Sequence, residues 1–318
     1  MSENQVITPE QLEEYMQGLY AKSKVAQKKF EREFTTNRRV DEVLRAIGMK
    51  TCEYAEELCT DALNETKMGN VNDKMSKLKG IVFGQWAICK GQNTVDYEDS
   101  PLEPGIKILY KPMGVIGCVM PSTNPVATII GNAMMALKGR NSVIIAPHPM
   151  SVRLSVKMVK LLREALESVG APADLIQCIS EEYASREATN LMMSTCDACI
   201  STGGAGRVKA AYSSGKPAFG VGQGNVQEIV DLGISDAELE RQATLCVAHR
   251  AKDNGVPYIS MPSSWSSGRD TCRSMALSSL IRMKILRPFV LWCSLTVAPS
   301  STEQLWASSP IRWAKCAA

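Results

Sequence analysis

The 318-residue sequence has two histidines, little excess charge and no long apolar run. His148 and His249 leave little room for an imidazole-based metal centre, so we expect no metal site. The net charge of +3 is too small to favour nucleic acid, and no apolar run approaches the ~18–20 residues of a membrane span. The N-terminal segment lacks the basic and apolar regions of a secretory signal. We therefore expect a cytoplasmic protein with neither a nucleic-acid nor a membrane partner.

The eleven cysteines are an odd number without the regular spacing of a disulfide framework, which predicts reduced thiols. Hydrophobic residues make up 45% of the chain and charged residues 22%, as in ordinary globular proteins. The length allows about two domains of the usual ~100–200 residues each.

Acidic residues almost disappear near Val256. Residues 256–318 hold two of the 33 acids, Asp270 and Glu303, but seven of the 36 bases, four of the five tryptophans and 13 serines. No sustained period of 2 or 3.6 is visible there. A solvated domain normally mixes acids with bases, so this tail is unlike the preceding 255 residues, and disorder is one interpretation of it.

Helical patterns dominate the N-terminal part, with helices expected at 9–33, 39–68 and 72–92. Thr8 is a suitable N-cap for the first helix, and Pro9 suits its first position. Short apolar strands alternate with helices further on. We expect strands at 114–120, 142–146, 174–179, 198–201 and from 217, and helices at 125–138, 151–169, 182–193, 204–213 and 236–249.

The alternation of strands and helices predicts right-handed βαβ units and a parallel sheet. The helix at 151–169 is expected to be amphipathic, with Gly170 at its end and one apolar stripe made of Val152, Val156, Val159, Leu162 and Leu166.

Ligands bind at the carboxyl ends of the strands in such sheets, so the loops that follow strands are the candidate sites. The loop 121–125 has two interpretations: Asn124 stabilises an oxyanion, or the polar residues of the loop only cap the following helix. In the loop 146–149, His148 contacts a ribose or phosphate, or is a solvated loop residue. The glycines of 201–206 either approach a phosphate or form a strand-to-helix turn. The glycines of 220–225 indicate a close approach of the backbone either to a ligand or to a neighbouring loop.

Several motifs in order resemble one family. They are PMGVIG at 112–117, PSTNP at 121–125, GRNSVIIAPHP at 139–149, STGGAGRV at 201–208, GVGQGN at 220–225 and DNG at 253–255. Between about residues 9 and 257 the sequence resembles the aldehyde dehydrogenase superfamily, in particular the CoA-acylating branch of acetaldehyde and propionaldehyde dehydrogenases.

The resemblance implies an α/β fold in which N-terminal helices precede a Rossmann-like parallel sheet with helices on both faces. It divides the chain into an N-terminal helical segment, 1–100, that packs on the cofactor domain, a Rossmann-like NAD-binding domain, 101–255, and a non-homologous tail, 256–318. The implied reaction converts a small aldehyde, CoA and NAD to an acyl-CoA and NADH through attack by a cysteine thiolate. The sequence leaves NAD and NADP open. The family forms homo-oligomers, but this chain lacks much of the interface.

The resemblance also implies site residues. Asn124 matches the residue that stabilises the oxyanion. Gly222 and Gln223 fall where hydrolytic relatives carry a glutamate base, which fits transfer to CoA. The residues implied at the cofactor are Ser122, Thr123, Ala146, Pro147, His148, Ser201, Thr202, Gly203, Gly204, Gly222 and Gln223.

The sequence departs from the family where the nucleophile is expected. Tyr258 occupies the position of the catalytic cysteine, and no Glu-Gln pair follows closely. A phenol with a pKa near ~10 cannot replace a thiolate, so we expect a chain that is inactive as written and lacks the catalytic domain. Because the resemblance ends where the composition changes, we suspect a shifted reading frame. Residues 259–267, written as degenerate codons in another frame, permit Ile-Asn-Ala-Glu-Gln-Leu-Val-Ile.

Three alternatives stay open. In the first, the chain is a working oxidoreductase that uses another nucleophile, such as Cys272. Cys246 is not the candidate, because it is expected to lie in a helix and to be buried in the core. In the second, it is a non-catalytic NAD-binding or assembly subunit, for example of a shell-enclosed metabolic complex. The third alternative concerns the helix at 9–33, which either packs on the cofactor domain or serves in targeting.

Overall fold

The computed structural model describes residues 7–222, 224 and 235–256. The chain divides into two compact units, Met1–Gln223 and Gly224–Ala318. Two expected site residues, Gln223 and Tyr258, lie outside the described residues, as do Cys272 and the tail beyond Val256. Among the described helices, none has both the length and the apolar character needed to cross a membrane.

Four helices open the first unit: α1 Pro9–Glu33, α2 Asn37–Glu53, α3 Ala55–Thr66 and α4 Val71–Cys89. Thr8 caps α1 through a capping box with Gln11, which confirms the predicted start. The single helix predicted at 39–68 is wrong, because the chain turns at Tyr54 (φ −98°, ψ 16°) between α2 and α3. The sequence around Tyr54 has neither Gly nor Pro and therefore gives no sign of this break.

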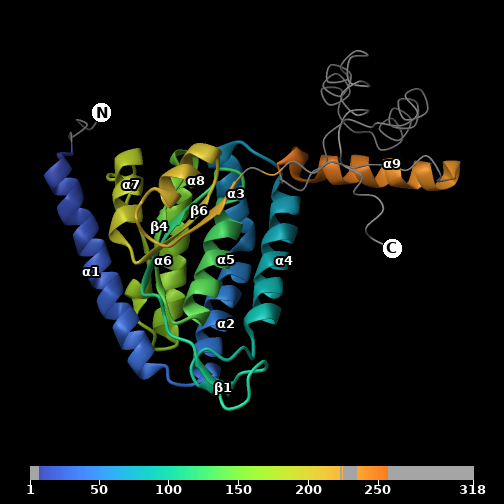
Figure 1. The fold of residues 1–318 in the computed structure, drawn as a ribbon. Helices are drawn as coiled ribbons and strands as arrows, with labels where there is room; N and C mark the ends of the chain where they lie inside the picture. Colours follow the sequence, from blue (N-terminus) through green and yellow to red (C-terminus); the bar gives the residue numbers. More distant parts are fainter. Residues whose placement is uncertain (1–6, 223, 225–234, 257–318) are drawn as a thin grey trace, which may run out of the picture. The chain divides into compact units, whose positions relative to one another are not determined.

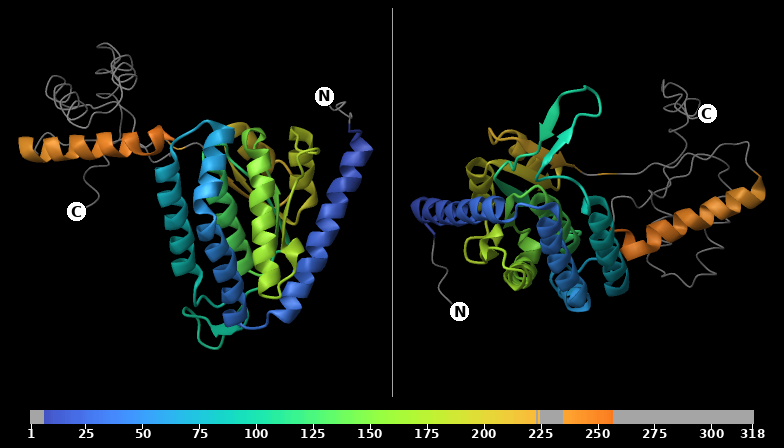
Figure 2. Two further views of the ribbon diagram at one scale, coloured as in Figure 1. Left: turned by 180° about the vertical axis from the view of Figure 1, so that it is seen from behind. Right: turned by 90° about the horizontal axis from the view of Figure 1, so that it is seen from below.

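The sheet of the first unit is entirely parallel, as predicted. Its strands are β3 Val115–Val119, β4 Ser142–Ala146, β5 Ile176–Cys178, β6 Ala198–Thr202 and β7 Ala218–Val221, in the spatial order β5-β4-β3-β6-β7. A separate antiparallel hairpin, β1 Tyr97–Asp99 and β2 Lys107–Leu109, was not expected from the sequence. This hairpin projects from the rest of the first unit (Figure 2).

The remaining helices fall close to the predicted ranges. They are α5 Pro125–Lys138, α6 Val152–Ser168, α7 Arg186–Thr195 and α8 Ala205–Tyr212, with short 3-10 turns η1 Pro149–Ser151 and η2 Ala173–Leu175. The second unit contains α9 Asp236–Ala251 and η3 Lys252–Gly255, and Cys246 is buried, as expected for a residue of the helix core.

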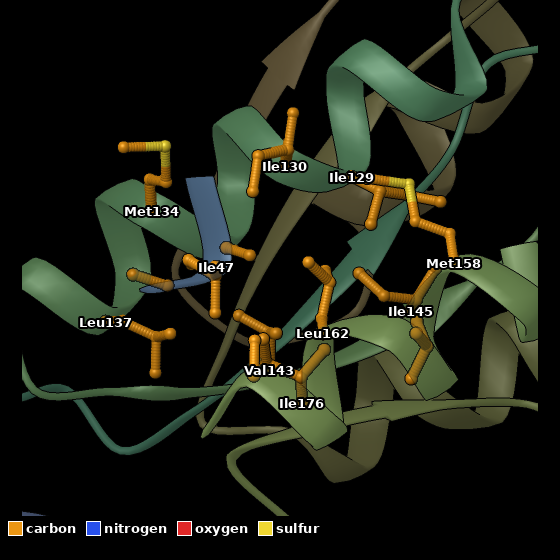
Figure 3. Close-up of a cluster of buried hydrophobic side chains, with 14 of the residues drawn as sticks. Ile47, Ile129, Ile130, Met134, Leu137, Val143, Ile145, Met158, Leu162 and Ile176 are labelled. Atoms are coloured by element: carbon orange, nitrogen blue, oxygen red, sulfur yellow. The ribbon is translucent and has the colours of Figure 1, made fainter. Parts of the chain in front are cut away.

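Helices cover both faces of the sheet, which confirms the predicted fold class (Figure 1). The larger core lies between the sheet and α2–α6, where aliphatic side chains of helices and strands meet (Figure 3). Its members include Ile47, Ile130, Leu137, Val143, Ile145, Met158, Leu162 and Ile176. The smaller core faces α1, α7 and α8, and includes Met16, Val115, Val119, Ile144, Met192, Cys199 and Ala211.

Neighbouring residues of β3 and β4 point to opposite cores, as the two-residue period of a strand requires. In β4, Val143 and Ile145 join the larger core, whereas Ile144 and Ala146 join the smaller one. Both strands are buried along their whole length and mainly apolar, as is usual for a parallel sheet that is covered on both faces.

The predicted stripe of α6 needs one correction. Val159, Leu162 and Leu166 are buried as expected, but Val156 is 37% exposed. Leu154 and Met158 are buried instead, because the face that meets the sheet and α2 is set one position away from the one predicted.

Candidate functional site

The order of the strands places a switch point at the carboxyl end of the sheet. β3 is central and pairs with β4 on one side and β6 on the other. The chain moves outward from β3 to β5 and then returns to β6, so the direction of winding reverses between β3 and β6. Such a switch point is where open α/β sheets bind ligands.

The register brings the ends of three strands to one level. Val119 of β3 lies opposite Ala146 of β4 and Ser201 of β6. The loops that follow these strands, 120–124, 147–149 and 203–204, therefore start from neighbouring points on the same edge. These loops contain most of the residues that the sequence predicted at the cofactor.

Asn124 ends the first loop and precedes α5. Its backbone lies at the N-cap position (φ −142°, ψ 56°), but its side chain makes no capping hydrogen bond. Its Oδ1 atom is buried without a hydrogen-bond partner among the described residues. The Asn124 carbonyl instead accepts hydrogen bonds from the Thr128 N–H (3.1 Å) and hydroxyl (2.7 Å). Side-chain capping therefore does not explain why an amide stands here.

A small pocket adjoins Asn124 in the first unit. Its walls include Cys59 of α3, Leu78 of α4 and Val126 of α5. Ser122 and Thr123, the other polar residues predicted in this loop, are half-buried just before Asn124. Lys74 and Lys77 of α4 also line this pocket, so Asn124 lies beside both apolar and basic side chains.

The second loop is held by the histidine side chain. Ala146 and Pro147 are buried, and the Met150 N–H donates to His148 Nδ1 at 3.1 Å. With Nδ1 accepting, the proton of the neutral ring lies on Nε2. Burial and, secondarily, the positive charge of Arg207 hold the pKa of His148 below its ordinary value.

The third loop joins β6 to α8. Ser201 is fully buried and its Oγ has no hydrogen-bond partner among the described residues, while Thr202, Gly203 and Gly204 are half-buried. Gly204 is the N-cap of α8 and supplies no side-chain acceptor. The first N–H groups of α8 are therefore left for another acceptor, and helix N-termini of this kind favour anions.

Arg207, which sequence reasoning missed, lies at the same edge of the sheet. It lies in the first turns of α8, and its Nη1 donates to the Met120 carbonyl at the end of β3, at 3.2 Å. Burial lowers the pKa of the guanidinium. No Asp or Glu forms an ion pair with Arg207 in the part of the chain that the structure describes. The available signal was an arginine shortly after a Gly-Gly turn, which gains meaning only once β3 and α8 are placed.

The remaining predicted residues are only partly located. Gly222 follows β7 and is exposed, while Gln223 and Tyr258 lie outside the described residues. No group of three His, Cys, Asp or Glu side chains that could hold a metal occurs among residues 7–222, 224 and 235–256. No disulfide joins the eight cysteines within those ranges.

The arrangement suits an anionic ligand that spans several strands. It offers the backbone N–H groups of α8, the guanidinium of Arg207 and the loop of His148 along one edge. Donors of this kind bind phosphate through charge-assisted hydrogen bonds. An adenine dinucleotide, with its phosphates and riboses, fits this donor set.

Comparison with known families gives one match over most of the chain. The model of the aldehyde dehydrogenase family matches residues 12–218. The succinate-semialdehyde dehydrogenase (acetylating) of Clostridium kluyveri is 42% identical over 238 residues, which cover 75% of this chain and 51% of the relative. The sulfoacetaldehyde dehydrogenase (acylating) of Bilophila wadsworthia is 38% identical over 69% of this chain and 46% of its own length.

Solved structures agree with these sequence matches. An acetylating aldehyde dehydrogenase from Geobacillus thermoglucosidasius superposes with a TM-score of 0.78 at 30% identity, over 86% of this chain and 59% of that chain. A propionaldehyde dehydrogenase from the fucose utilisation bacterial microcompartment of Clostridium phytofermentans gives 0.73 at 27% identity, over 86% and 61%. The chain spans about half the length of the curated relatives that it matches.

Proposed function

The chain belongs to the aldehyde dehydrogenase family, and from that premise we propose that it is the nicotinamide-cofactor-binding part of a CoA-acylating enzyme. The observation that supports this most strongly is the meeting of three polar loops at the switch point of the sheet. The proposed division is a helical segment, 1–100, a cofactor domain, 101–255, and a tail, 256–318.

The reaction of the lineage is the conversion of an aldehyde, CoA and NAD⁺ to an acyl-CoA, NADH and a proton. The bound cofactor would accept the hydride that leaves the aldehyde carbon. Ser122, Thr123 and the residues of the second and third loops would hold the dinucleotide along the edge of the sheet. Asn124 would donate a hydrogen bond from its amide to the carbonyl oxygen, where negative charge develops.

Turnover is not expected from this chain as written. Tyr258 stands where the family places its nucleophile, and a phenol keeps its proton at neutral pH and forms no acyl thioester. The proposal is thus a dinucleotide-binding chain without aldehyde oxidation. A non-catalytic binding or assembly subunit is the role that this combination supports.

Free thiols and exposed apolar side chains bear on the setting of the protein. The free cysteines support a reducing, cytoplasmic location. Leu102 in the hairpin and Phe219 and Val221 on β7 are exposed, at 88%, 58% and 53%. Such side chains support association with a second copy, which light scattering of the purified chain would measure.

The experiment is to titrate the full chain with NAD⁺ and NADP⁺ by calorimetry, and to assay acyl-CoA formation with aldehyde and CoA present. We expect binding without turnover. Gly203→Leu fills the third loop and is expected to weaken binding at least ~10-fold, while Gly18→Leu, on an open surface of α1, leaves it unchanged. Failure to bind either dinucleotide would refute the proposal.

Turnover would point instead to another nucleophile. In that case Cys272→Ser separates the two explanations, because loss of acyl-CoA formation would identify the Cys272 thiol as the attacking group. Turnover that survives this substitution would leave the chain active by a route that neither explanation includes.

A further inference from the structure

The loop after β4 contains no carboxylate. In dinucleotide-binding folds an Asp or Glu after the second strand of the unit binds the adenosine 2′-hydroxyl, and its charge disfavours a 2′-phosphate. Here the corresponding residues are Ala146, Pro147, His148 and Pro149. The loop thus has no group that selects against a phosphate at this position.

Arg207 brings a positive charge to the same edge from α8. Its side chain runs along the third loop, where a Cβ on Gly203 would lie 3.3 Å from Arg207 Cδ. Its Nη1 reaches the carbonyl of Met120, which ends β3 beside β4. Only one of the five N–H donors of the guanidinium is used in this contact, so the others remain for an anion.

His148 and Arg207 are close enough to interact through their charges. Burial, and after it the positive charge of Arg207, lowers the pKa of His148, and the two residues follow β4 and β6 at the carboxyl edge of the sheet. Because His148 Nδ1 accepts from Met150, its Nε2–H is a second donor. The neutral His148 ring therefore offers one donor and the Arg207 guanidinium a positive charge with further donors, and an anion can accept from both.

The carboxylate that lies against the following helix is already engaged. Glu65 of α3 accepts hydrogen bonds from the Arg153 N–H (3.0 Å) and the Leu154 N–H (2.9 Å) at the start of α6. Its charge is therefore balanced by a helix N-terminus rather than by Arg207. Arg207 keeps a half-buried charge whose desolvation is not offset by any described acid.

We propose that Arg207, together with His148, binds the 2′-phosphate of NADP, so that the chain prefers NADP to NAD. This inference rests on the proposed function, because it requires that a dinucleotide occupies this edge. The preference would come from a charge-assisted contact between the guanidinium and the phosphate, which NAD cannot make.

The test is calorimetric titration of the full chain and two variants with NADP⁺, NAD⁺, 2′-AMP and 5′-AMP. Arg207→Gln removes the charge and keeps a polar, though shorter, side chain. Lys209→Gln removes the same charge from an exposed position two residues further along α8 and is the matched control. We expect the wild type to bind NADP⁺ at least ~10-fold more tightly than NAD⁺, as one charge-assisted contact allows.

Arg207→Gln is expected to abolish that preference and the preference for 2′-AMP over 5′-AMP, while Lys209→Gln keeps both. Arg207→Lys should restore part of the NADP affinity, because it restores charge without the planar fork. Equal weakening of NAD⁺ and NADP⁺ in Arg207→Gln would assign Arg207 to the pyrophosphate and overturn the inference. Tighter binding of NAD⁺ by the wild type would overturn it too but leave the proposed function intact, whereas no binding of either dinucleotide would end both.

Discussion

The two edges of the parallel sheet use their polar side chains differently. At the amino edge, where β3, β4 and β6 begin, side chains bind the backbone of neighbouring strands. At the carboxyl edge, where the same strands end, Asn124 Oδ1 and Ser201 Oγ have no hydrogen-bond partner among the described residues. The contrast separates residues that hold the fold from residues that are available to a ligand.

Asp197 is the centre of the amino edge. Its Oδ2 accepts from the Val115 N–H at 2.8 Å and from Lys24 Nζ at 2.7 Å, and its Oδ1 accepts from the Tyr20 hydroxyl at 3.0 Å. Asn141 acts similarly: its Oδ1 accepts from the Gly114 N–H, and its Nδ2 donates to the Ala136 carbonyl. These bonds tie α1, β3 and β6 together, and β3 to the end of α5.

The carboxyl edge presents Asn124 Oδ1 and Ser201 Oγ without partners, and Arg207 without a carboxylate. Buried polar groups normally find partners, so such exceptions favour a functional interpretation. The amino edge is not free of exceptions, since Ser142 Oγ and Arg140 Nε also lack partners. Each edge therefore has two such atoms in the described part of the chain, and the difference lies in the bonds that Asp197 and Asn141 make at the amino edge, which substitutions at matched positions can measure.

The largest effect is expected for Gly114→Ala at the amino edge. Gly114 has a φ of +124°, and a Cβ there would overlap the carboxylate of Asp197. Backbone strain and the displaced ion pair together should lower the free energy of unfolding by about 3 kcal/mol or more. Urea denaturation measures the loss. A loss of unfolding free energy below about 1 kcal/mol would show that the amino edge adjusts to the added methyl group.

Asp197→Ala is expected to cost about 2–3 kcal/mol of unfolding free energy, because three hydrogen bonds are lost at a partly exposed site. Burial opposes ionisation of Asp197, but the bonds from Lys24, Val115 and Tyr20 outweigh it and lower its pKa below 3.8. A lowered pKa stabilises the fold above the unfolded value and loses that effect as pH falls through the folded one. The difference in unfolding free energy between wild type and Asp197→Ala should therefore become smaller below about pH 4. A difference that stays constant on acidification would contradict a stabilising role for the Asp197 carboxylate.

A pair of asparagines offers the most direct comparison of the two edges. Asn141→Ala breaks two hydrogen bonds and should cost about 2 kcal/mol, whereas Asn124→Ala removes a buried oxygen that has no partner and should change stability by less than about 0.5 kcal/mol. Chemical denaturation of both variants under one set of conditions is sufficient. Equal costs would remove the distinction between the edges.

The smallest effect concerns the titration of His148. Since Arg207 contributes to its lowered pKa, Arg207→Gln should move that pKa upward, while Lys209→Gln leaves it in place. The chain has only two histidines, so the imidazole signals in NMR spectra are easily assigned with a His249→Gln variant. An unchanged pKa in Arg207→Gln would place the guanidinium too far away to act on the ring.

The elements of the sheet were largely predictable, because their signals are local. The helix Pro125–Lys138 and the strand Ser142–Ala146 match the predicted bounds, since each is a mainly apolar segment between clear end signals. The turn at Tyr54 was not predictable, because ordinary helix-forming residues surround it. Val156 was assigned to the wrong face because periodicity alone does not determine which of two adjacent stripes meets the sheet.

The sequence also predicted the loops after the strands as the candidate site, and three of them start at one edge of the sheet, but the contacts of their side chains were not predictable. That Asn124 occupies the N-cap position without capping depends on its side-chain torsions and neighbours. Arg207 was missed because its significance comes from the packing of α8 beneath the end of β3, which joins residues 87 positions apart. Long-range contacts of this kind have no local pattern in the sequence.

The central position of β3 also has a consequence for the order of folding. Ile116 pairs with Val143, 27 positions later, and with Ala198, 82 positions later. The longer loop costs more entropy to close, and distant pairings form slowly. The seam between β3 and β6 should therefore close after the seam between β3 and β4, and pulse-labelled hydrogen exchange would detect the delay. A nascent chain would then bury its larger core before the edge that would hold a cofactor is complete.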